Sequence, residues 1–227
     1  MRKIAFVTGG HGDIGSVIVE ELTQNNIEVI RPRSTELDLS SVDYINSYFS
    51  TTRIPNIDIF IHCAGFNTPA SFSAIQPEDI RKIFNINTFA FLELTKKLSY
   101  SMMKKKEGHI LAISSLYGTA SRRNRISYTM SKHALNGAVK TLSIELGEHN
   151  IKVNSLSPGY VATKMTKKNN DAKQIGLWES RIPLGRLASP VDIAKVSLFL
   201  CSDNNQYISG QNIIVDGGYS IGGYESA

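Results

Sequence analysis

Lys3-Ile-Ala-Phe-Val-Thr-Gly-Gly-His-Gly-Asp-Ile-Gly15 is the stretch of sequence that decides the fold. Its first five residues are mainly β-branched, apolar or aromatic and indicate a strand. A glycine-rich turn follows, and residues 16–25 have the apolar spacing of an amphipathic helix. Glycines let backbone amides approach a pyrophosphate, and the amino end of a helix offers free donors and a partial positive charge. The stretch therefore predicts a dinucleotide-binding turn, with a plain tight turn as the alternative.

The rest of the chain continues this alternation of strands and helices. We expect strands at residues 3–8, 27–31, 57–62, 109–114, 151–157 and 212–215. We expect helices near residues 14–25, 40–50, 77–105, 127–147 and 190–201. Such alternation gives crossover connections and a parallel sheet with helices on both faces. We therefore predict an α/β fold, a doubly wound parallel sheet (Rossmann fold), in a single domain of residues 1–227.

One connection in this pattern is unusually short. The chain passes from Arg33, after the second strand, to Asp38 with too few residues for a helix between them. We therefore expect the sheet to lack its usual covering helix at this place.

The composition fits one globular domain without cross-links. A chain of 227 residues buries roughly 70–75% of its unfolded surface. The two cysteines, Cys63 and Cys201, and the five histidines show no ligand spacing, so we expect neither disulfides nor a metal site. No apolar run is long enough to span a membrane and no signal segment precedes the first strand, so we expect a cytoplasmic protein without a membrane partner.

The basic residues give the chain a formal net charge of +5. They gather at residues 104–106, 122–125 and 164–168. A basic face can bind nucleic acid, but no nucleic-acid motif accompanies these charges. We therefore expect them to be solvated and expect no nucleic-acid partner.

The segment Tyr128-Thr-Met-Ser-Lys132 places a phenol and an ammonium one helical turn apart, on one face of a helix. Ser115, thirteen residues earlier, ends an apolar run that we expect to be a strand, and strand ends are where open α/β sheets bind ligands. An ammonium favours phenolate, so we expect Lys132 to lower the pKa of Tyr128 and the set to act on a carbonyl. An ordinary half-buried helix is the alternative. Two further Tyr-x-x-x-Lys pairs lack a hydroxyl residue at that distance, Tyr100/Lys104 and Tyr160/Lys164.

Together these motifs resemble the short-chain dehydrogenase/reductase family, from Lys3 to about Gly218. The matching segments, in chain order, are Thr8-Gly9 with Gly15, His62-Cys-Ala-Gly65, Asn85-Ile-Asn87, the set Ser115, Tyr128 and Lys132, Pro158-Gly-Tyr-Val-Ala-Thr163, and Ile208 to Gly218. The chain departs from the family pattern at Asp13, which replaces the middle glycine, and at His62-Cys63, which replace two asparagines. We expect Asp13 to turn away from the phosphates and to cap the helix by accepting from Gly15 or Ser16.

The resemblance implies reversible hydride transfer between a nicotinamide cofactor and a ketone or secondary alcohol. It implies that Tyr128 gives a proton to the carbonyl oxygen while Ser115 holds that oxygen by a hydrogen bond. Lys132 is expected to tune the phenol and to hold the cofactor ribose. Asn87 is expected to anchor a water that relays protons to Lys132.

The resemblance also implies a set of cofactor contacts. They are Gly9, His11, Asp13, Ile14, Gly15, Arg33, Ser34, Asp38, Leu39, Cys63, Ala64, Gly65, Tyr128, Lys132, Pro158, Gly159, Val161 and Thr163, the last of which contacts the carboxamide. At the end of the second strand an acidic residue would bond the ribose 2′-hydroxyl, whereas an arginine accepts a 2′-phosphate. An ungapped alignment places Arg33 there, so NADP(H) is favoured over NAD(H), with Glu36 as the competing residue.

By overall similarity, the favoured activity is that of a 3-oxoacyl-carrier-protein reductase. The alternatives are a dehydrogenase/reductase of a sugar or small polar alcohol, and a non-catalytic dinucleotide-sensing or scaffold protein. The family likeness implies a substrate lid near residues 164–182, in which Trp178 either lines the site or packs the lid. It also implies a homo-oligomer, a tetramer or dimer. The run from Arg122 to Arg125 lies beside the expected crevice, and we hypothesise that it attracts an anionic substrate or a phosphopantetheine carrier.

Overall fold

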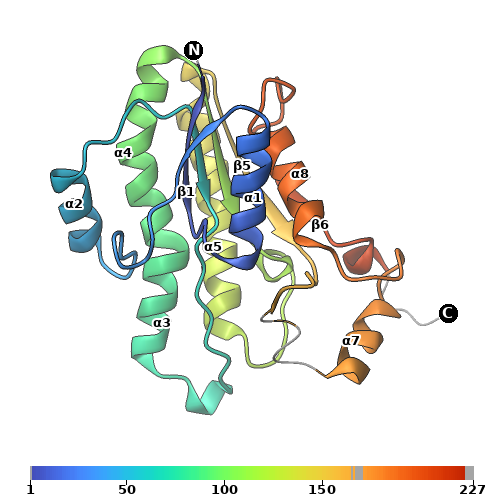
Figure 1. Ribbon diagram of the computed structural model, residues 1–227. Coiled ribbons are helices and arrows are strands. Elements are labelled where there is room, and N and C mark those ends of the chain that lie inside the picture. Colours follow the sequence, from blue (N-terminus) through green and yellow to red (C-terminus); the bar gives the residue numbers. More distant parts are fainter. Residues whose placement is uncertain (1, 165, 167–170, 223–227) are drawn as a thin grey trace.

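The protein is built around one parallel β-sheet (Figure 1). The computed structural model describes residues 2–164, 166 and 171–222. Six strands lie in the order β2-β1-β3-β4-β5-β6, and every neighbouring pair is parallel. Their bounds are β1 (Ile4–Thr8), β2 (Glu28–Ile30), β3 (Ile59–His62), β4 (Gly108–Ile113), β5 (Ile151–Pro158) and β6 (Asn212–Val215). Each lies within its predicted range or extends it by one residue, so the predicted doubly wound parallel sheet is confirmed.

Helices cover both faces of the sheet, as predicted. One face carries α1 (Asp13–Gln24) and α8 (Pro190–Leu200), and the other carries α2 (Val42–Thr51), α4 (Ala90–Lys105) and α5 (Ile126–Glu145) (Figure 1). Side chains of a strand point alternately to its two faces. In β1, Ala5 and Val7 pack on the α1 and α8 side, whereas Phe6 packs on the side of α4 and α5. Both layers are therefore held by apolar side chains of the same central strands.

The helix predicted for residues 77–105 is divided into three parts. Regular helix α3 (Pro77–Phe84) passes into a π-helical turn, Asn85–Phe89, and then into α4. The π-turn places Asn87 and Thr88 in the interior of the protein. Single π-turns inside α-helices occur mostly at functional sites. The apolar periodicity of the sequence does not show this interruption.

The connection after β2 is short, and no helix lies between residues 33 and 38. The short helix α2 follows and covers the sheet there, with Ile45 buried in the core, so the expectation that the sheet lacks a covering helix at this place is wrong. Only β2 lies beyond β1 on this side of the sheet, and the chain then crosses to β3 on the other side of β1. The strand order therefore reverses between β1 and β3, and such a reversal is where open α/β sheets bind ligands.

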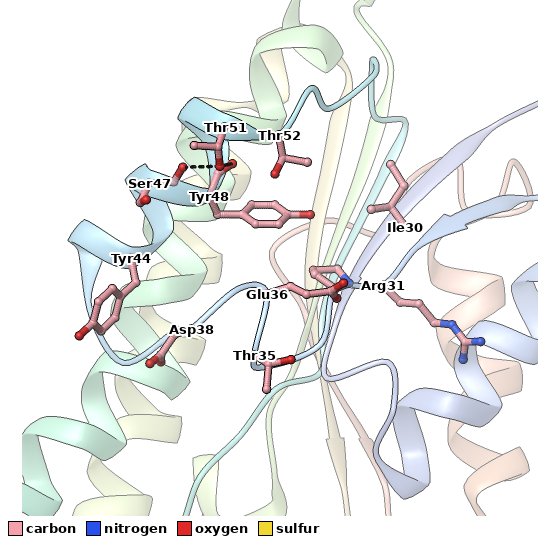
Figure 2. Close-up of a pocket in the computed structure, with 11 residues that line it drawn as sticks. Ile30, Arg31, Thr35, Glu36, Asp38, Tyr44, Ser47, Tyr48, Thr51 and Thr52 are labelled. Atoms are coloured by element: carbon pink, nitrogen blue, oxygen red, sulfur yellow. Dashed lines mark hydrogen bonds between the residues drawn. The ribbon is translucent and has the colours of Figure 1, made fainter.

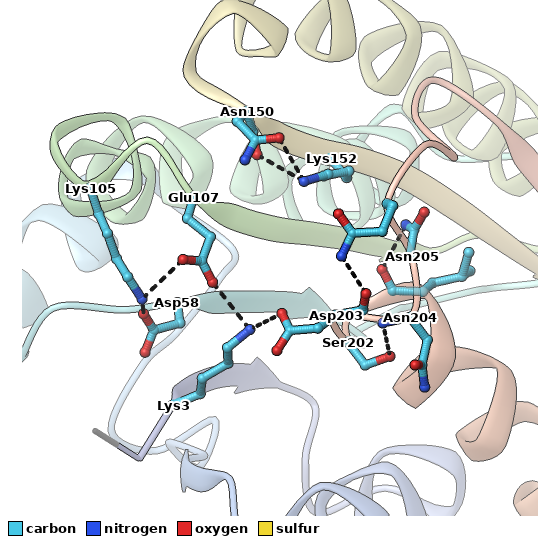
Figure 3. Close-up of polar contacts among 12 residues, drawn as sticks. Lys3, Asp58, Lys105, Glu107, Asn150, Lys152, Ser202, Asp203, Asn204 and Asn205 are labelled. Atoms are coloured by element: carbon cyan, nitrogen blue, oxygen red, sulfur yellow. Dashed lines mark hydrogen bonds and ion pairs between the residues drawn. The ribbon is translucent and has the colours of Figure 1, made fainter.

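Charged side chains form ion pairs at the amino-terminal end of the sheet (Figure 3). Lys3, just before β1, pairs with Glu107 at 3.2 Å and with Asp203 after α8. Lys105, at the end of α4, pairs with Asp58 at 2.6 Å. An isolated surface ion pair contributes little to stability, whereas a network of pairs contributes more. This network joins four segments that are distant in sequence, at the end of the sheet opposite the candidate site.

Candidate active site

The carboxyl ends of the central strands meet at one end of the sheet, away from the amino terminus (Figure 1). Gly9 follows β1, Cys63 follows β3, Ser115 lies just after β4, and Gly159 follows β5. The parallel arrangement thus gathers residues from four distant parts of the chain at the point where the strand order reverses.

Tyr128 and Lys132 lie on one face of α5, as their spacing predicts. The Nζ atom of Lys132 lies 5.6 Å from the centroid of the Tyr128 ring. Lys132 is buried, and its Nζ donates to the carbonyl oxygen of Ile113 at 2.8 Å. Since Ile113 is the last residue of β4, this bond fixes the start of α5 to the end of the strand.

Ser115 completes the set at the end of β4. Its Oγ accepts a hydrogen bond from the backbone amide of Tyr117 at 3.2 Å, which fixes the side chain. Hydrogen bonding from Ser115 lowers the pKa of Tyr128, so the two hydroxyls are neighbours. The ring of Tyr117 packs edge-to-face on the Tyr128 ring, with the centroids 6.3 Å apart. The structure therefore brings Ser115, Tyr128 and Lys132 together.

The electrostatic environment of Tyr128 differs from the sequence-based expectation. Burial has the largest effect and raises the pKa of the Tyr128 phenol, while Ser115 and the Arg125 guanidinium lower it. Burial also lowers the pKa of Lys132 to about 8. The role of Lys132 in lowering the phenol pKa stays a prediction, and in this structure its Nζ donates to the carbonyl of Ile113. Arg125 is a cation that lowers the phenol pKa, and the sequence motif did not indicate it.

Hydrogen bonds to Phe66 and Ser131 hold the side chain of Asn87, which lies in the π-turn. Its Oδ1 accepts from the amide of Phe66 at 2.7 Å, and its Nδ2 donates to the carbonyl of Phe66 and to Ser131, both at 3.0 Å. A Cβ atom on Gly65 would lie 3.8 Å both from Asn87 Oδ1 and from Lys132 Nζ. Asn87 and Lys132 therefore both lie next to Gly65.

His62 links three parts of the site. Its Nε2 lies 3.0 Å from the carbonyl oxygen of Ile86, and its Nδ1 lies 3.0 Å from the hydroxyl of Thr8. Because a carbonyl only accepts, Nε2 donates and Nδ1 accepts from Thr8. The Thr8 hydroxyl in turn accepts from the amide of Ala64 at 3.3 Å. Burial lowers the pKa of His62 to about 3, so the ring is neutral and joins the glycine turn, the end of β3 and the π-turn.

A cavity of about 440 Å³ lies between the ends of β1 and β3. Nine of the residues predicted to hold the cofactor line it, namely Gly9, His11, Arg33, Ser34, Asp38, Leu39, Cys63, Ala64 and Gly65. Sequence reasoning missed the remaining lining residues, Thr8, Gly12, Pro32, Leu37, Phe66 and Ile86. The sequence offered one signal for these residues, which is that they lie near predicted cofactor contacts along the chain. The volume and place of the cavity suit the adenosine part of a dinucleotide.

The glycine turn fits close against the end of β3. Gly9 has a φ of +66°, and a Cβ atom there would lie 2.6 Å from the amide nitrogen of Ala64. A Cβ atom on Gly15 would lie 2.1 Å from the carbonyl oxygen of Gly9. Side chains are therefore excluded at both positions. Ile14 and Gly15 lie in the first turn of α1, where free backbone amides favour phosphate.

Asp13 lies beside this turn but not as the helix cap. Gly12 is the N-cap of α1 and makes no side-chain capping bond. The Oδ2 atom of Asp13 accepts from the backbone amide of Lys164 at 2.7 Å. The expectation that Asp13 caps its own helix is therefore wrong, because its carboxylate is directed to the loop after β5. That loop begins after Pro158 and carries three more predicted cofactor contacts, Gly159, Val161 and Thr163.

Arg33 and Glu36 line two different cavities. The second cavity, of about 620 Å³, lies between the end of β2 and α2 (Figure 2). Glu36 lines this second cavity, and its Oε2 accepts from the amide of Arg33 at 2.6 Å. Asp38 lines both cavities.

An aromatic cluster joins the segment predicted as a lid to the rest of the site. Trp178, in α7 (Ala172–Glu179), stacks on Tyr160 with centroids 4.5 Å apart and is 7% exposed. Tyr219 packs edge-to-face on Tyr160 at 5.2 Å, and the Arg122 guanidinium lies 5.8 Å from the Trp178 ring. Of the two roles expected for Trp178, the structure shows packing of this segment. Residues 165 and 167–170 of the predicted lid lie outside the described part of the chain.

The two cysteines are free thiols, as expected. Cys63 lines the cavity between β1 and β3, and burial raises its pKa to about 12. Burial also raises the pKa of Cys201, which lies in the core. Within the described residues, no group of three or more His, Cys, Asp or Glu side chains could hold a metal ion, and no helix is long and apolar enough to cross a membrane.

Comparison with known proteins agrees with these features. The family described as Enoyl-(Acyl carrier protein) reductase matches residues 13–220. A 3-oxoacyl-[acyl-carrier-protein] reductase of Rickettsia felis is 32% identical over 95% of this chain and 96% of its own length. A reductase of the same name from Aquifex aeolicus is 32% identical over 94% of this chain and 86% of its own.

Solved structures show the same architecture. A 4-hydroxyisoleucine dehydrogenase complexed with NADH has a TM-score of 0.89 and 27% identity, covering 97% of this chain and 99% of that one. A gluconate 5-dehydrogenase from Burkholderia cenocepacia, in complex with NADP and tartrate, has a TM-score of 0.87 over 96% and 95% of the two chains. At 20% identity the latter shows the fold alone. The chain therefore belongs to the short-chain dehydrogenase/reductase family, a family of nicotinamide-dependent oxidoreductases, as its motifs indicated.

Proposed function

We propose that the protein interconverts a ketone and a secondary alcohol with NADP(H), and that 3-oxoacyl groups are its favoured substrate class. The observation that carries this proposal is the assembly of Ser115, Tyr128 and Lys132 beside Gly65, which lines the dinucleotide cavity. The identity to 3-oxoacyl-carrier-protein reductases over nearly the whole chain supports the substrate class.

Each member of the set has a role that its surroundings support. When bound, the nicotinamide supplies or takes the hydride at the substrate carbon. Tyr128 gives a proton to the carbonyl oxygen, and burial, which raises the pKa of the phenol, keeps that proton in place at neutral pH. Ser115 holds the same oxygen by a hydrogen bond. Lys132 holds the ribose and, with Asn87, which also lies next to Gly65, returns a proton to Tyr128 by way of water.

The cofactor contacts proposed are those that the resemblance implied. Nine of them line the cavity between β1 and β3, which supports adenosine binding there. Asp13, Ile14 and Gly15 lie at the amino end of α1, where the pyrophosphate would be held by backbone amides. Tyr128 and Lys132 contact the nicotinamide ribose, and Pro158, Gly159, Val161 and Thr163 contact the nicotinamide end.

NADP(H) is the proposed cofactor rather than NAD(H). Arg33 lines the cofactor cavity, whereas the competing Glu36 faces the second cavity and accepts from the amide of Arg33. A guanidinium at that position binds a ribose 2′-phosphate, to which it donates hydrogen bonds. Michaelis constants for NADPH and NADH measure this choice directly, and a preference for NADH would count against it.

A sugar or small polar alcohol is the second candidate substrate class. The cluster of Tyr117, Tyr160, Tyr219 and Arg122 favours it, because these groups offer polar contacts near the Tyr128 ring. The structural likeness to 4-hydroxyisoleucine dehydrogenase also supports a small polar substrate. A dinucleotide sensor without turnover has less support, because the proton donor and its lysine are both present.

We also propose that the chain is one domain with a lid near residues 164–182, and that it acts as a cytoplasmic homo-oligomer, a tetramer or dimer. Exposed apolar side chains on and beside α4 and α5 support self-association. They are Phe89, Tyr100, Ile126, Met130 and Ile144. Sedimentation of the purified protein tests the oligomeric state.

A substrate panel tests the proposed function. The purified protein is mixed with NADPH and with 3-oxoacyl thioesters, keto sugars or simple ketones, and the absorbance of the reduced nicotinamide is followed. We expect turnover of 3-oxoacyl compounds or of small polar ketones. Binding of NADPH without turnover of any ketone would favour the sensor instead.

A further inference from the structure

The loop between Ser115 and Tyr128 carries two guanidinium groups, one of which acts on Tyr117 and the other on Tyr128. Desolvation opposes the charge of Arg122, yet hydrogen bonding to Tyr117 and the nearby phenols raise its pKa on balance. Arg122 therefore lies against Tyr117, whose ring contacts the Tyr128 ring at 6.3 Å between centroids. The guanidinium also lies 5.8 Å from the Trp178 ring, which gives it a defined position at the aromatic cluster.

Arg125 is the second guanidinium, and one of its nitrogen atoms lacks an acceptor among the described residues. It is the N-cap residue of α5, three residues before Tyr128, and its charge acts on the Tyr128 phenol. Its Nη1 atom is buried, and no hydrogen-bond acceptor within the described structure receives it. A buried cationic donor without an acceptor is costly, so a bound anion at this place would be strongly favoured.

We propose that the ketone substrate carries a carboxylate, which Arg125 and Arg122 hold beside Tyr128, and that short oxo acids are the natural substrate class. The two oxygens of a carboxylate match the parallel N–H groups of a guanidinium. The anion has to lie near the reacting carbonyl, because Arg125 is the N-cap of α5, only three residues before Tyr128 on the same helix. The phosphate of a phosphopantetheine arm is separated from its acyl carbonyl by many more bonds. This inference rests on the proposed carbonyl reduction and narrows the proposed 3-oxoacyl substrates to small free acids, in place of carrier-bound groups.

The experiment compares 3-oxobutanoate with its ethyl ester, which present the same ketone with and without the negative charge. We measure kcat/KM with NADPH for the wild type and for Arg122→Ser, Arg122→Lys, Arg125→Gln and Arg123→Ser. Arg123 is an exposed neighbour in the same loop and serves as the matched control. A hydrogen bond to a charged group corresponds to about 10- to 100-fold in an equilibrium, so Arg122→Ser should lower kcat/KM for the acid by that factor.

The ester separates recognition of charge from loss of packing. Arg122→Ser should change kcat/KM for the ester little, Arg122→Lys should recover part of the activity on the acid, and Arg123→Ser should change neither substrate. Arg125→Gln should reduce turnover of the acid more than turnover of the ester. Equal losses on both substrates in Arg122→Ser would show that Arg122 only packs Trp178, and this outcome overturns the inference. Equal effects of Arg122→Ser and Arg123→Ser would show general attraction by the basic loop and would overturn it too.

Failure of the inference is distinguishable from failure of the proposed function. If the wild type reduces the ester at least as well as the acid, the carboxylate site is refuted while carbonyl reduction stands. If the wild type reduces neither compound nor any ketone of the panel, both proposals fall.

Discussion

Replacing Tyr128 by phenylalanine removes one oxygen atom from the site and leaves the ring in place. The ring contacts with Lys132, at 5.6 Å, and with Tyr117, at 6.3 Å, do not involve the hydroxyl and are retained. The cavity between β1 and β3 does not include Tyr128 among its lining residues, so adenosine binding is unaffected. The loss therefore falls on the proton transfer.

The size of that loss follows from the role of the hydroxyl. General acid catalysis contributes about 10² to 10⁴ in rate, which is about 3 to 5 kcal/mol in activation free energy. Tyr128→Phe should therefore retain at most about one per cent of wild-type kcat, while the dissociation constant for NADPH should rise by at most about tenfold, the effect of one lost hydrogen bond to the ribose. Its free energy of unfolding should stay within about 1 kcal/mol of the wild type, because one hydrogen-bonded hydroxyl is lost.

Tyr100→Phe is the matched control for this experiment. Tyr100 is 59% exposed, and the Nζ of Lys104 lies 4.4 Å from its ring, so it is a second Tyr and Lys pair one helical turn apart. Initial rates of NADPH oxidation and fluorescence titration with NADPH are measured for both variants. The role of Tyr128 is refuted if Tyr128→Phe keeps more than about a tenth of the wild-type rate. It is refuted equally by a comparable loss in Tyr100→Phe.

Three further predictions concern stability. Burial lowers the folded pKa of Lys132 to about 8, below its ordinary value of about 10.4. The unfolded chain therefore binds more protons between these two pH values, and the free energy of unfolding should rise with pH there. Urea unfolding of Lys132→Met should lack this rise, and the same dependence on pH in the variant and the wild type would contradict the lowered pKa of Lys132. Burial lowers the folded pKa of His62 to about 3, so the stability that its neutral ring contributes is complete above the ordinary value of about 6.5 and is lost as the pH falls toward about 3. His62→Asn should therefore lose less stability on acidification, as thermal unfolding at several pH values would show. Ser189 caps α8: its side chain accepts from the backbone of Asp192, and the Asp192 side chain accepts from the backbone of Ser189. Ser189→Ala should therefore lower the free energy of unfolding by about 1 kcal/mol and leave kcat unchanged. A loss of kcat without a loss of stability would argue against a purely structural cap.

The sheet was predictable because its determinants are local. Parallel strands buried on both faces are short apolar runs, and the glycine turn after β1 follows directly from its residues. The Tyr128 and Lys132 pair was predictable for the same reason, since one helical turn brings the two side chains together. The π-turn at Asn85–Phe89 was not, because the bonds that hold Asn87 come from Phe66 and Ser131, which lie elsewhere in the chain.

The electrostatics of the site were less predictable than its geometry. The pKa of the Tyr128 phenol depends on its depth of burial and on Arg125, whose place depends on how the loop before α5 packs. The orientation of the Lys132 side chain depends on the end of β4, where the carbonyl of Ile113 accepts a hydrogen bond from its Nζ. A motif states which residue types are present but not which neighbour each charge faces.

Asp13 shows the same limit at the position where this chain departs from its family. A glycine at this position would present only its backbone to a phosphate. The Asp13 carboxylate instead accepts from the amide of Lys164, 151 residues away in sequence. Lys164 directly follows Thr163, in the loop proposed to hold the nicotinamide end of the cofactor. The carboxylate is therefore occupied by a backbone donor, which reduces its repulsion of a phosphate and attaches that loop to the amino end of α1. The replacement that looked unfavourable for cofactor binding thus joins the two segments between which the dinucleotide is proposed to lie.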